Sequence, residues 1–359
     1  MYFPIIFFIA FILSLLGVIF VRKINHKYSL LLQPKEDRWH EVPIAVHGGF
    51  GFFPPFLALT LFTSALFLNI DLIQSSELDG SFYDLIFIIA LCGSSIALMI
   101  LGWLDDISDI SPTIKLFWQI LISLLFIMDA GSFQISDIQI INTTFTLIWF
   151  VGIINATNFI DCMDGLCAGS LIIISLGILL VIGLAETNIG NLFHIKNILI
   201  ILLGCLLGYF MLNVPPAKIF MGDSGSLPLG FIIAALALPT NMNGYYGYEN
   251  VTGNSSTIVA ISIMCYPIFD TTLVAFTRIL KGRKFYIGGK DHSSHIFVKM
   301  GLSERKSLAF CLLISIIGQI TAISIIASPA NLMTGFISLL LILLTIGFII
   351  GKYSVKHDL

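Results

Sequence analysis

Long apolar stretches separated by short polar connections run through this sequence from one end to the other. A helix needs about 20 mostly apolar residues to cross a bilayer, and eleven stretches approach that length. They cover residues 2–21, 50–70, 85–104, 113–130, 143–158, 168–186, 196–212, 227–241, 256–278, 307–327 and 331–351. The pattern predicts an all-α, polytopic bundle of about eleven transmembrane helices, with residues 1–359 forming a single integral membrane domain.

Composition supports a membrane protein and excludes two other classes. The chain is 57% hydrophobic and only 11% charged, whereas soluble domains carry about 25% charged residues. A soluble fold could not hide this much apolar surface. The six cysteines form no C-x-x-C pair and lie mostly in apolar stretches, so we expect neither a disulfide framework nor a zinc site.

Basic residues in the connections predict the orientation of the helices, because Lys and Arg gather on the cytoplasmic side of membrane proteins. With the N-terminus outside and the helices alternating in direction, only Lys196 of the 18 Lys and Arg residues falls on the outer side. The C-terminus is then cytoplasmic. The cytoplasmic connections lie at about residues 22–49, 105–115, 155–167, 213–226 and 279–306.

Four polar motifs fall in these cytoplasmic connections or at the helix ends beside them. They contain, in chain order, Asp105, Asp106 and Lys115; Asn155, Asn158, Asp161 and Asp164; Gly222 and Asp223; and His292 and His295. In the second motif a polar residue recurs at every third position, which would stack four polar side chains along one helix face. In the third motif, glycines on both sides of the aspartate would let a phosphate approach the backbone closely.

Carboxylates at membrane depth point to a bound cation. An ionised Asp costs roughly 2.5–3.5 kcal/mol at the centre of a spanning helix, and the adjacent Asp105 and Asp106 repel each other unless a cation lies nearby. Hard oxygen ligands suit Mg²⁺ better than zinc. Because Mg²⁺ prefers one or two carboxylates plus substrate phosphates, the motifs predict a diphosphate substrate.

Each motif also has an ordinary structural interpretation. An Asp-Asp pair after a helix is often a solvated cap, and an Asn-x-x-Asn face can join two membrane helices. The Gly-Asp-Ser-Gly segment could be a turn, and histidines in a basic loop are often at the surface. All four motifs lie on one side of the predicted bundle, which favours a shared site.

In these motifs the chain resembles the polyprenyl-phosphate N-acetylhexosamine-1-phosphate transferases (bacterial glycosyltransferase family 4), which include phospho-N-acetylmuramoyl-pentapeptide transferase. The resemblance runs from about residue 34 to 306 and is most specific at residues 220–226 and 155–166. Upstream, the segment from His40 to Gly49 keeps the family's H-x-x-P-x-x-x-x-G-G spacing.

The resemblance implies a role for each motif. Asn158 and Asp223 would bind Mg²⁺, with Mn²⁺ as a substitute. Catalytic positions would be Asp105, Asp106, Lys115, Asp161 and Asp164, and substrate-binding positions would be His40, Asn155, Gly222, His292 and His295. The chain departs from the family pattern at Cys162, where glycine is usual, and at Ser294, where histidine is common. These departures leave the identity of the sugar open.

The implied activity is a phosphotransferase reaction on the cytoplasmic face of the bacterial inner membrane. A polyprenyl phosphate oxygen would attack the β-phosphorus of a UDP-N-acetylhexosamine-type sugar and release UMP, as the first membrane step of a cell-envelope polysaccharide or O-antigen pathway. The implied partners are this lipid, the nucleotide sugar and the membrane, with no nucleic acid, and a homodimer is compatible.

Two alternatives remain at this stage. One is the phospho-N-acetylmuramoyl-pentapeptide transferase of peptidoglycan synthesis. The other, from a different class, is a secondary transporter of an anionic substrate. Transporters tend to have repeated halves and a site near the bilayer midplane, and this sequence shows no internal repeat.

Overall fold

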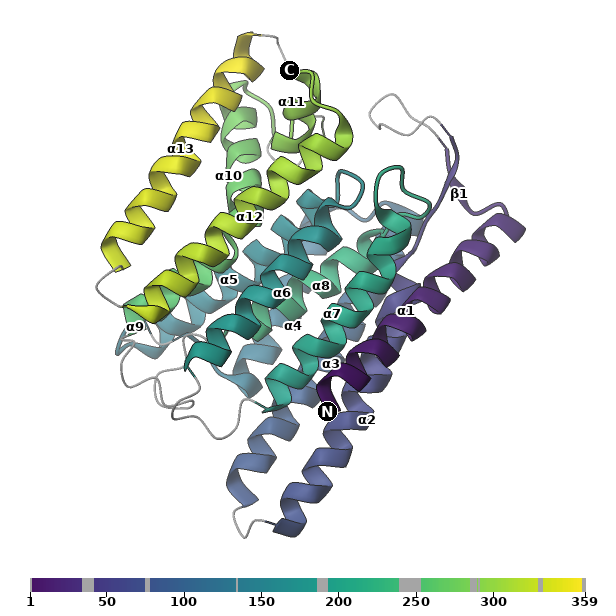
Figure 1. Cartoon of the computed structure of the whole chain (residues 1–359), viewed down its shortest axis with the longest axis vertical. Helices are drawn as coiled ribbons and strands as arrows, with labels where there is room; N and C mark the ends of the chain where they lie inside the picture. Colours follow the sequence, from purple (N-terminus) through teal and green to yellow (C-terminus); the bar gives the residue numbers. More distant parts are fainter. Residues whose placement is uncertain are drawn as a thin grey trace.

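Helices make up almost the whole of the computed structural model, which describes residues 2–33, 42–74, 78–133, 135–185, 193–238, 253–284, 289, 291–328 and 332–356 (Figure 1). The long helices are α1 (Tyr2–Lys27), α2 (Gly49–Gln74), α3 (Leu78–Ser108), α4 (Pro112–Ala130), α5 (Gln139–Ile160), α6 (Leu166–Ala185), α7 (Phe193–Asn213), α12 (Glu304–Ala327) and α13 (Leu332–Lys356). The shorter helices are α8 (Asp223–Ala237), α9 (Gly253–Ile263), α10 (Cys265–Leu280) and α11 (Ser293–Lys299). The prediction of a helical membrane bundle is confirmed.

Nine of the described helices are long and apolar enough to cross a membrane, and the count rises to ten if α9 and α10 form one span. All eleven predicted stretches contain a helix. The predicted continuous helix at 256–278 is wrong, because α9 and α10 meet at a bend of 76°. Pro267 explains the break: its ring would clash with the carbonyl four residues earlier, at Ile263, where α9 ends.

The short helix α8 is the centre of the molecule. Every residue from Ser224 to Ala237 is buried, and α8 packs against α2, α3, α5 and α6. Its 15 residues span only about 22 Å, less than the roughly 30 Å hydrocarbon core of a bilayer. Because α8 is surrounded by protein, it does not have to match the thickness of the lipid.

A small β-structure ties the segment before α2 to the start of α8. The strands β1 (Leu31–Leu32) and β2 (Ile44–Ala45) pair antiparallel, and Ala45 forms a parallel bridge with Ile219. Beyond the bridge, Gly48 N–H donates to the Phe220 carbonyl at 2.8 Å. The segment before α2 is therefore held directly beside the third polar motif.

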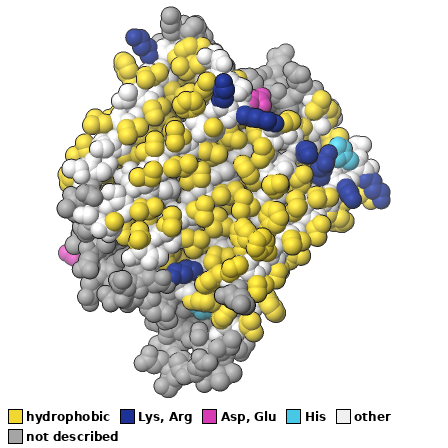
Figure 2. Space-filling view, in the orientation of Figure 1, with side chains coloured by type: hydrophobic (Ala, Val, Ile, Leu, Met, Phe, Trp, Pro, Cys, Tyr) yellow, Lys and Arg dark blue, Asp and Glu magenta, His cyan; other side chains and the backbone are white. Residues whose placement is uncertain are grey.

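The surface of the bundle separates apolar from basic side chains. A broad hydrophobic surface covers the face shown in Figure 2, and Lys and Arg gather mostly along its upper right edge. The chain's N-terminus lies at the opposite end of the bundle from this edge (Figure 1). This distribution is typical of a multi-pass membrane protein with one basic side.

Candidate active site

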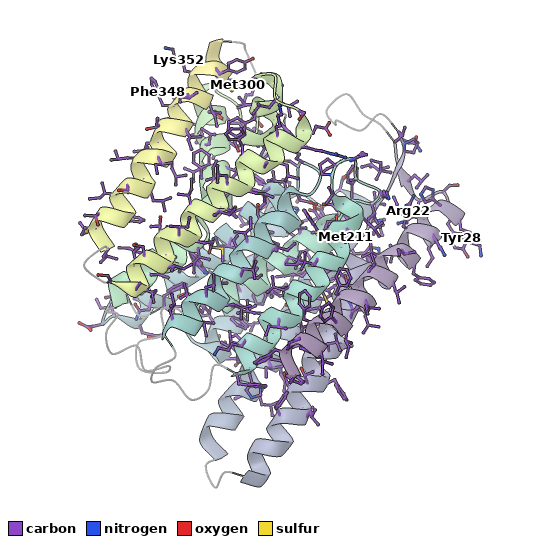
Figure 3. The ribbon with its side chains drawn as sticks, in the orientation of Figure 1. Arg22, Tyr28, Met211, Met300, Phe348 and Lys352 are labelled. Atoms are coloured by element: carbon purple, nitrogen blue, oxygen red, sulfur yellow. The ribbon has the colours of Figure 1, made fainter. Side chains whose placement is uncertain are left out.

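The four polar motifs lie at the basic end of the bundle. In Figure 3 the labelled residues Arg22 and Tyr28, at the end of α1, and Met211 lie on the right of the bundle, whereas Met300 and Lys352 lie at its top. Met211, Met300 and Lys352 lie at or near the ends of α7, α11 and α13, and these are the ends nearest to the motifs. Helices that are distant in sequence therefore present their polar ends together.

Asp105 and Lys115 are brought together by the short connection between α3 and α4. Ser111 caps α4 and Pro112 begins it, a combination that favours a helix start and places Lys115 in the first turn. The Lys115 ammonium donates to Asp105 Oδ2 at 2.9 Å, and the Ile110 N–H donates to Asp105 Oδ1 at 2.8 Å. Both oxygens of this carboxylate are thus occupied.

Asp106 joins the end of α3 to the start of α8. Its carboxylate accepts the backbone N–H groups of Asp223 at 2.9 Å and of Ser224 at 3.2 Å, which satisfies two of the donors left open at a helix N-terminus. The imidazole Nδ1 of His47 lies 3.2 Å from Asp106 Oδ2. His47 was not among the predicted site residues, although it lies in the segment from His40 to Gly49 that keeps the family's spacing.

Gly222 is required by this arrangement. Its φ is +76°, a backbone conformation that L side chains rarely adopt, and a Cβ there would lie 2.7 Å from Asp106 Oδ2. The glycine therefore allows the Asp106 carboxylate to reach the start of α8.

Asp223 is the residue on which the motifs converge. The ammonium of Lys115 contacts its Oδ2, and the Asn158 side-chain amide donates to its Oδ1 at 2.7 Å. The same Asn158 amide donates to Ser226 Oγ at 2.9 Å. We call Asp105, Asp106, Lys115, Asn158 and Asp223 the acid centre; it joins the first three motifs in one hydrogen-bonded network.

The predicted stripe of four polar side chains on one helix is only half correct. Helix α5 ends at Ile160, so Asp161 caps it and Asp164 lies in the following turn. The Asp164 Oδ2 accepts the backbone N–H of Ala217 at 2.7 Å. Asp164 thus holds the connection between α7 and α8 against the turn that follows α5.

Burial and nearby carboxylates raise the pKa of Asp161 well above its usual range. Burial is the largest cause, and the charges of Asp223, Cys162, Asp106 and Asp164 raise the pKa further. An approaching cation would lower this pKa again by favouring the ionised form.

Asn155, which was predicted to bind substrate, contacts a neighbouring helix. The Asn155 amide donates to Gln119 Oε1 at 2.8 Å, so this side chain joins α5 to α4 rather than turning to the acid centre. This contact matches the alternative of a helix–helix junction, and the role of Asn155 in substrate binding stays a prediction. His40 lies outside the described residues.

The fourth motif is built around a buried aspartate that sequence analysis missed. Asp270 of α10 is fully buried, and its carboxylate lies 2.7 Å from His292 Nδ1 and accepts the Ser293 N–H at 2.8 Å and the Ser293 hydroxyl at 2.5 Å. An ionisable residue within an apolar stretch is itself a signal of function. It could have indicated Asp270.

A second buried pair holds the same segment. The Arg278 guanidinium donates to both oxygens of Asp291 at 2.7 and 2.6 Å, the two-pronged geometry that Arg favours. Although burial would raise the pKa of Asp291, Arg278 holds it below its usual value. We call residues 291–295 the histidine segment; α10 anchors it at both of these points.

The acid centre and the histidine segment meet at the end of α5. Asn158 faces the acid centre, while the ring of Phe159 lies edge-on to His292 with centroids 6.0 Å apart. His295 Nε2 lies 3.1 Å from the Cys162 carbonyl. The last turn of α5 and the turn after it therefore form the common wall of the two groups.

The side-chain oxygens of the acid centre suit a hard cation that also binds oxygens of the substrate phosphates. Among the residues that the structure describes, no group of three or more His, Cys, Asp or Glu side chains could hold a metal ion by itself. The oxygens of Asp223 and of the Asn158 amide are suitable ligands for Mg²⁺, which commonly takes one or two protein ligands and completes its shell with phosphates and water. Asn158 would have to turn its amide to present oxygen instead of nitrogen.

Comparison with known proteins points to one group of enzymes. The family model described as "Glycosyl transferase family 4" matches residues 88–241. A probable undecaprenyl-phosphate N-acetylglucosaminyl 1-phosphate transferase of Bacillus subtilis (strain 168) is 30% identical over 348 residues, which cover 93% of this chain and 89% of that protein.

Two further relatives match with similar identity. A decaprenyl-phosphate N-acetylglucosaminephosphotransferase of Mycobacterium tuberculosis (strain ATCC 25618 / H37Rv) is 27% identical over 331 residues, 87% of this chain and 80% of that protein. A phospho-N-acetylmuramoyl-pentapeptide-transferase of Streptococcus agalactiae serotype III (strain NEM316) is 30% identical over 232 residues, 59% of this chain and 66% of that protein. The similarity to the first two relatives extends over more of the chain.

Proposed function

Because the chain belongs to glycosyl transferase family 4, we propose that it transfers the 1-phosphate of a UDP-activated N-acetylated amino sugar to a polyprenyl phosphate and releases UMP. The observation that carries the proposal is the convergence of three separate motifs on Asp223. The relatives that match over most of their length carry names of this reaction type with N-acetylglucosamine. The shorter match to the pentapeptide transferases makes that activity the second choice.

The residues of the acid centre would act mainly by positioning the two phosphate substrates. Phosphoryl transfer needs little covalent help from the protein and depends on alignment and charge neutralisation. Lys115 would contact the diphosphate, since its ammonium already bridges two carboxylates at the focus of the site. Asp106 would keep the start of α8, and with it Asp223, at a fixed position.

A proton-abstracting base is not required in this scheme. The second pKa of a phosphate ester is about 6, so the attacking lipid phosphate is largely ionised at neutral pH. The oxygens of Asp105 and Asp106 already accept hydrogen bonds from Lys115 and from backbone N–H groups. These carboxylates are better suited to holding their neighbours than to removing a proton.

Mg²⁺, or Mn²⁺ in its place, would be held by Asn158 and Asp223. When bound, such an ion supplies neutralisation of the diphosphate charge as UMP departs. Burial and the nearby carboxylates raise the pKa of Asp161, and a bound cation would lower this pKa and favour the ionised form.

The location of the site suits a lipid and a water-soluble substrate. The acid centre lies at the basic end of the bundle, where Lys and Arg gather (Figure 2), and we propose that this end faces the cytoplasm at the bacterial inner membrane. A lipid phosphate reaches the same depth from the headgroup layer. A transporter site would lie nearer the midplane.

Replacement of Asp223 by Asn tests this function. Membranes or purified protein would be incubated with polyprenyl phosphate and a panel of UDP-N-acetyl amino sugars, and released UMP and lipid-linked sugar would be measured. We expect Asp223→Asn to lose at least 100-fold in activity, by analogy with removal of one preorganised electrostatic group.

The matched control is Asp109→Asn. Asp109 is an exposed aspartate four residues from Asp105, and its φ of +47° is readily adopted by Asn. Its replacement should leave the rate near wild type. Full activity in Asp223→Asn, or no UMP release with any UDP-sugar, would reject the proposal.

A further inference from the structure

Cys162 differs from the other cysteines of the chain. All six cysteines lie in described residues; five are buried and Cys162 is partly exposed. It stands in the turn between α5 and α6, directly after Asp161. Of the six cysteines, Cys162 is therefore the residue least enclosed by the protein.

Two imidazoles lie beside this turn, and a buried carboxylate lies behind one of them. The Ser294 hydroxyl lies 3.7 Å from the Cys162 sulfur, His295 Nε2 lies 3.1 Å from the Cys162 carbonyl, and the ring centroids of His292 and His295 are 5.6 Å apart. Behind His292, the Asp270 carboxylate lies 2.7 Å from Nδ1. The order cysteine, histidine, buried aspartate is the arrangement that activates a thiol as a nucleophile.

We propose that Cys162 is a thiol modification site, at which peroxides and alkylating electrophiles react and thereby stop the transferase. The part of this inference that concerns inhibition rests on the proposed function, whereas the reactivity of the thiol does not. The reaction with a peroxide is a two-electron oxidation. The Cys162 sulfur attacks one peroxide oxygen, the O–O bond breaks, the thiolate becomes a sulfenic acid, and the departing hydroxide takes a proton from the His292 imidazolium.

The charges around Cys162 keep it in the reactive thiolate form. Burial would raise its pKa, but the adjacent His292 and His295 outweigh burial and lower the pKa to about 6. Burial also opposes protonation of His292, yet the Cys162 thiolate and Asp270 raise the pKa of that imidazole well above its usual range. The other charged groups that face this turn are Asp161, Asp164 and, from α12, Glu304.

Modification at this position would interfere with both parts of the site. The Cys162 carbonyl contacts His295, and the preceding Asp161 lies close enough to feel the charge of Asp223. An added group on the sulfur would therefore stand between the histidine segment and the acid centre. It would occupy space where the proposed nucleotide sugar has to contact both.

The reactivity can be measured on the full-length protein in detergent with iodoacetamide at pH 6. At this pH a thiol of pKa about 6 is half ionised, whereas an ordinary thiol of pKa about 8.5 is about 0.3% ionised. After allowance for the lower nucleophilicity of an acidic thiolate, Cys162 should react about tenfold faster than an ordinary thiol. Mass spectrometry of each cysteine peptide gives the rates, and protein unfolded in SDS gives the reference rate for all six.

Two variants and one ligand sharpen the experiment. His292→Gln should slow the labelling of Cys162 toward the reference rate, and UMP, as a fragment of the proposed substrate, should protect Cys162. Hydrogen peroxide should inactivate the wild type reversibly, with recovery by dithiothreitol. The Cys162→Ser variant, compared with its own starting activity, should resist peroxide.

Several results would overturn the inference. Labelling of Cys162 no faster than the reference, or equal labelling in wild type and His292→Gln, contradicts the reactive thiol. Full activity with Cys162 completely modified contradicts the inhibition. A wild-type protein that releases no UMP contradicts the proposed function, whereas the labelling rates test the thiol independently.

Discussion

Lys115 offers the sharpest test of the acid centre, because it is the positive charge shared by two carboxylates. Its ammonium lies 2.9 Å from Asp105 Oδ2 and also contacts Asp223, and only 15% of the side chain is exposed. At about 4 Å and an effective dielectric constant near 20, each such pair is worth roughly 4 kcal/mol before desolvation. The partial exposure of both carboxylates reduces this value.

We expect Lys115→Gln to lower kcat about 100- to 1,000-fold, the usual effect of removing one preorganised group from a charged transition state. Without the ammonium, Asp105 and Asp223 attract a divalent cation more strongly. The Mg²⁺ concentration for half-maximal activity should therefore fall while kcat falls. Lys115→Arg keeps the charge with a different shape and should give an intermediate rate.

The assay is UMP release by purified protein over a range of Mg²⁺ concentrations. Lys218→Gln is the control, since Lys218 is an exposed basic residue in the connection just before α8. A rate for Lys115→Gln within tenfold of wild type would refute the reasoning. An equal loss in Lys218→Gln would show that general charge, rather than this contact, matters.

Three further predictions follow from other parts of the site. Gly222→Ala should destabilise the protein by about 1–3 kcal/mol and displace Asp106, as seen by thermal unfolding and UMP release; Gly93→Ala, where a Cβ meets no atom within 4 Å, should do neither. Arg278→Gln should lower the free energy of unfolding by about 3 kcal/mol at pH 7. Because Arg278 lowers the pKa of Asp291, this contribution is present above about pH 4 and is lost as the pH falls through the lowered pKa; a melting-temperature difference unchanged at pH 3 would contradict it. EDTA should abolish UMP release, and added Mg²⁺ or Mn²⁺ should restore it; activity that persists in EDTA would exclude a metal requirement.

The apolar pattern predicted the helices well, because a stretch of that length has few alternatives to a buried or spanning helix. The sequence predicted that the motifs lie on one side of the membrane but not that they converge on Asp223. Spacing along the chain does not show which helix ends meet. Pro267 was a local signal for the bend between α9 and α10, but a prediction from hydrophobicity alone does not use it. Asp270 was missed because it lies inside an apolar stretch, outside every polar motif.

The position of Asn155 shows a different limit. Its three-residue spacing to Asn158 predicted a common face, yet its amide pairs with Gln119 on a neighbouring helix. Spacing on one helix fixes the direction of a side chain but not the identity of the helix that it meets. That information depends on packing between helices, which the sequence of a single segment does not contain.

The enclosure of α8 by other helices has a consequence for how the protein is assembled during synthesis. A helix of 15 residues that begins with an aspartate is a weak candidate for insertion into lipid as an independent segment. Four of the helices that surround it, α2, α3, α5 and α6, precede it in the chain. The ribosome therefore makes α8 after these four neighbours, so the helices that can shield it from lipid are already synthesised when it emerges.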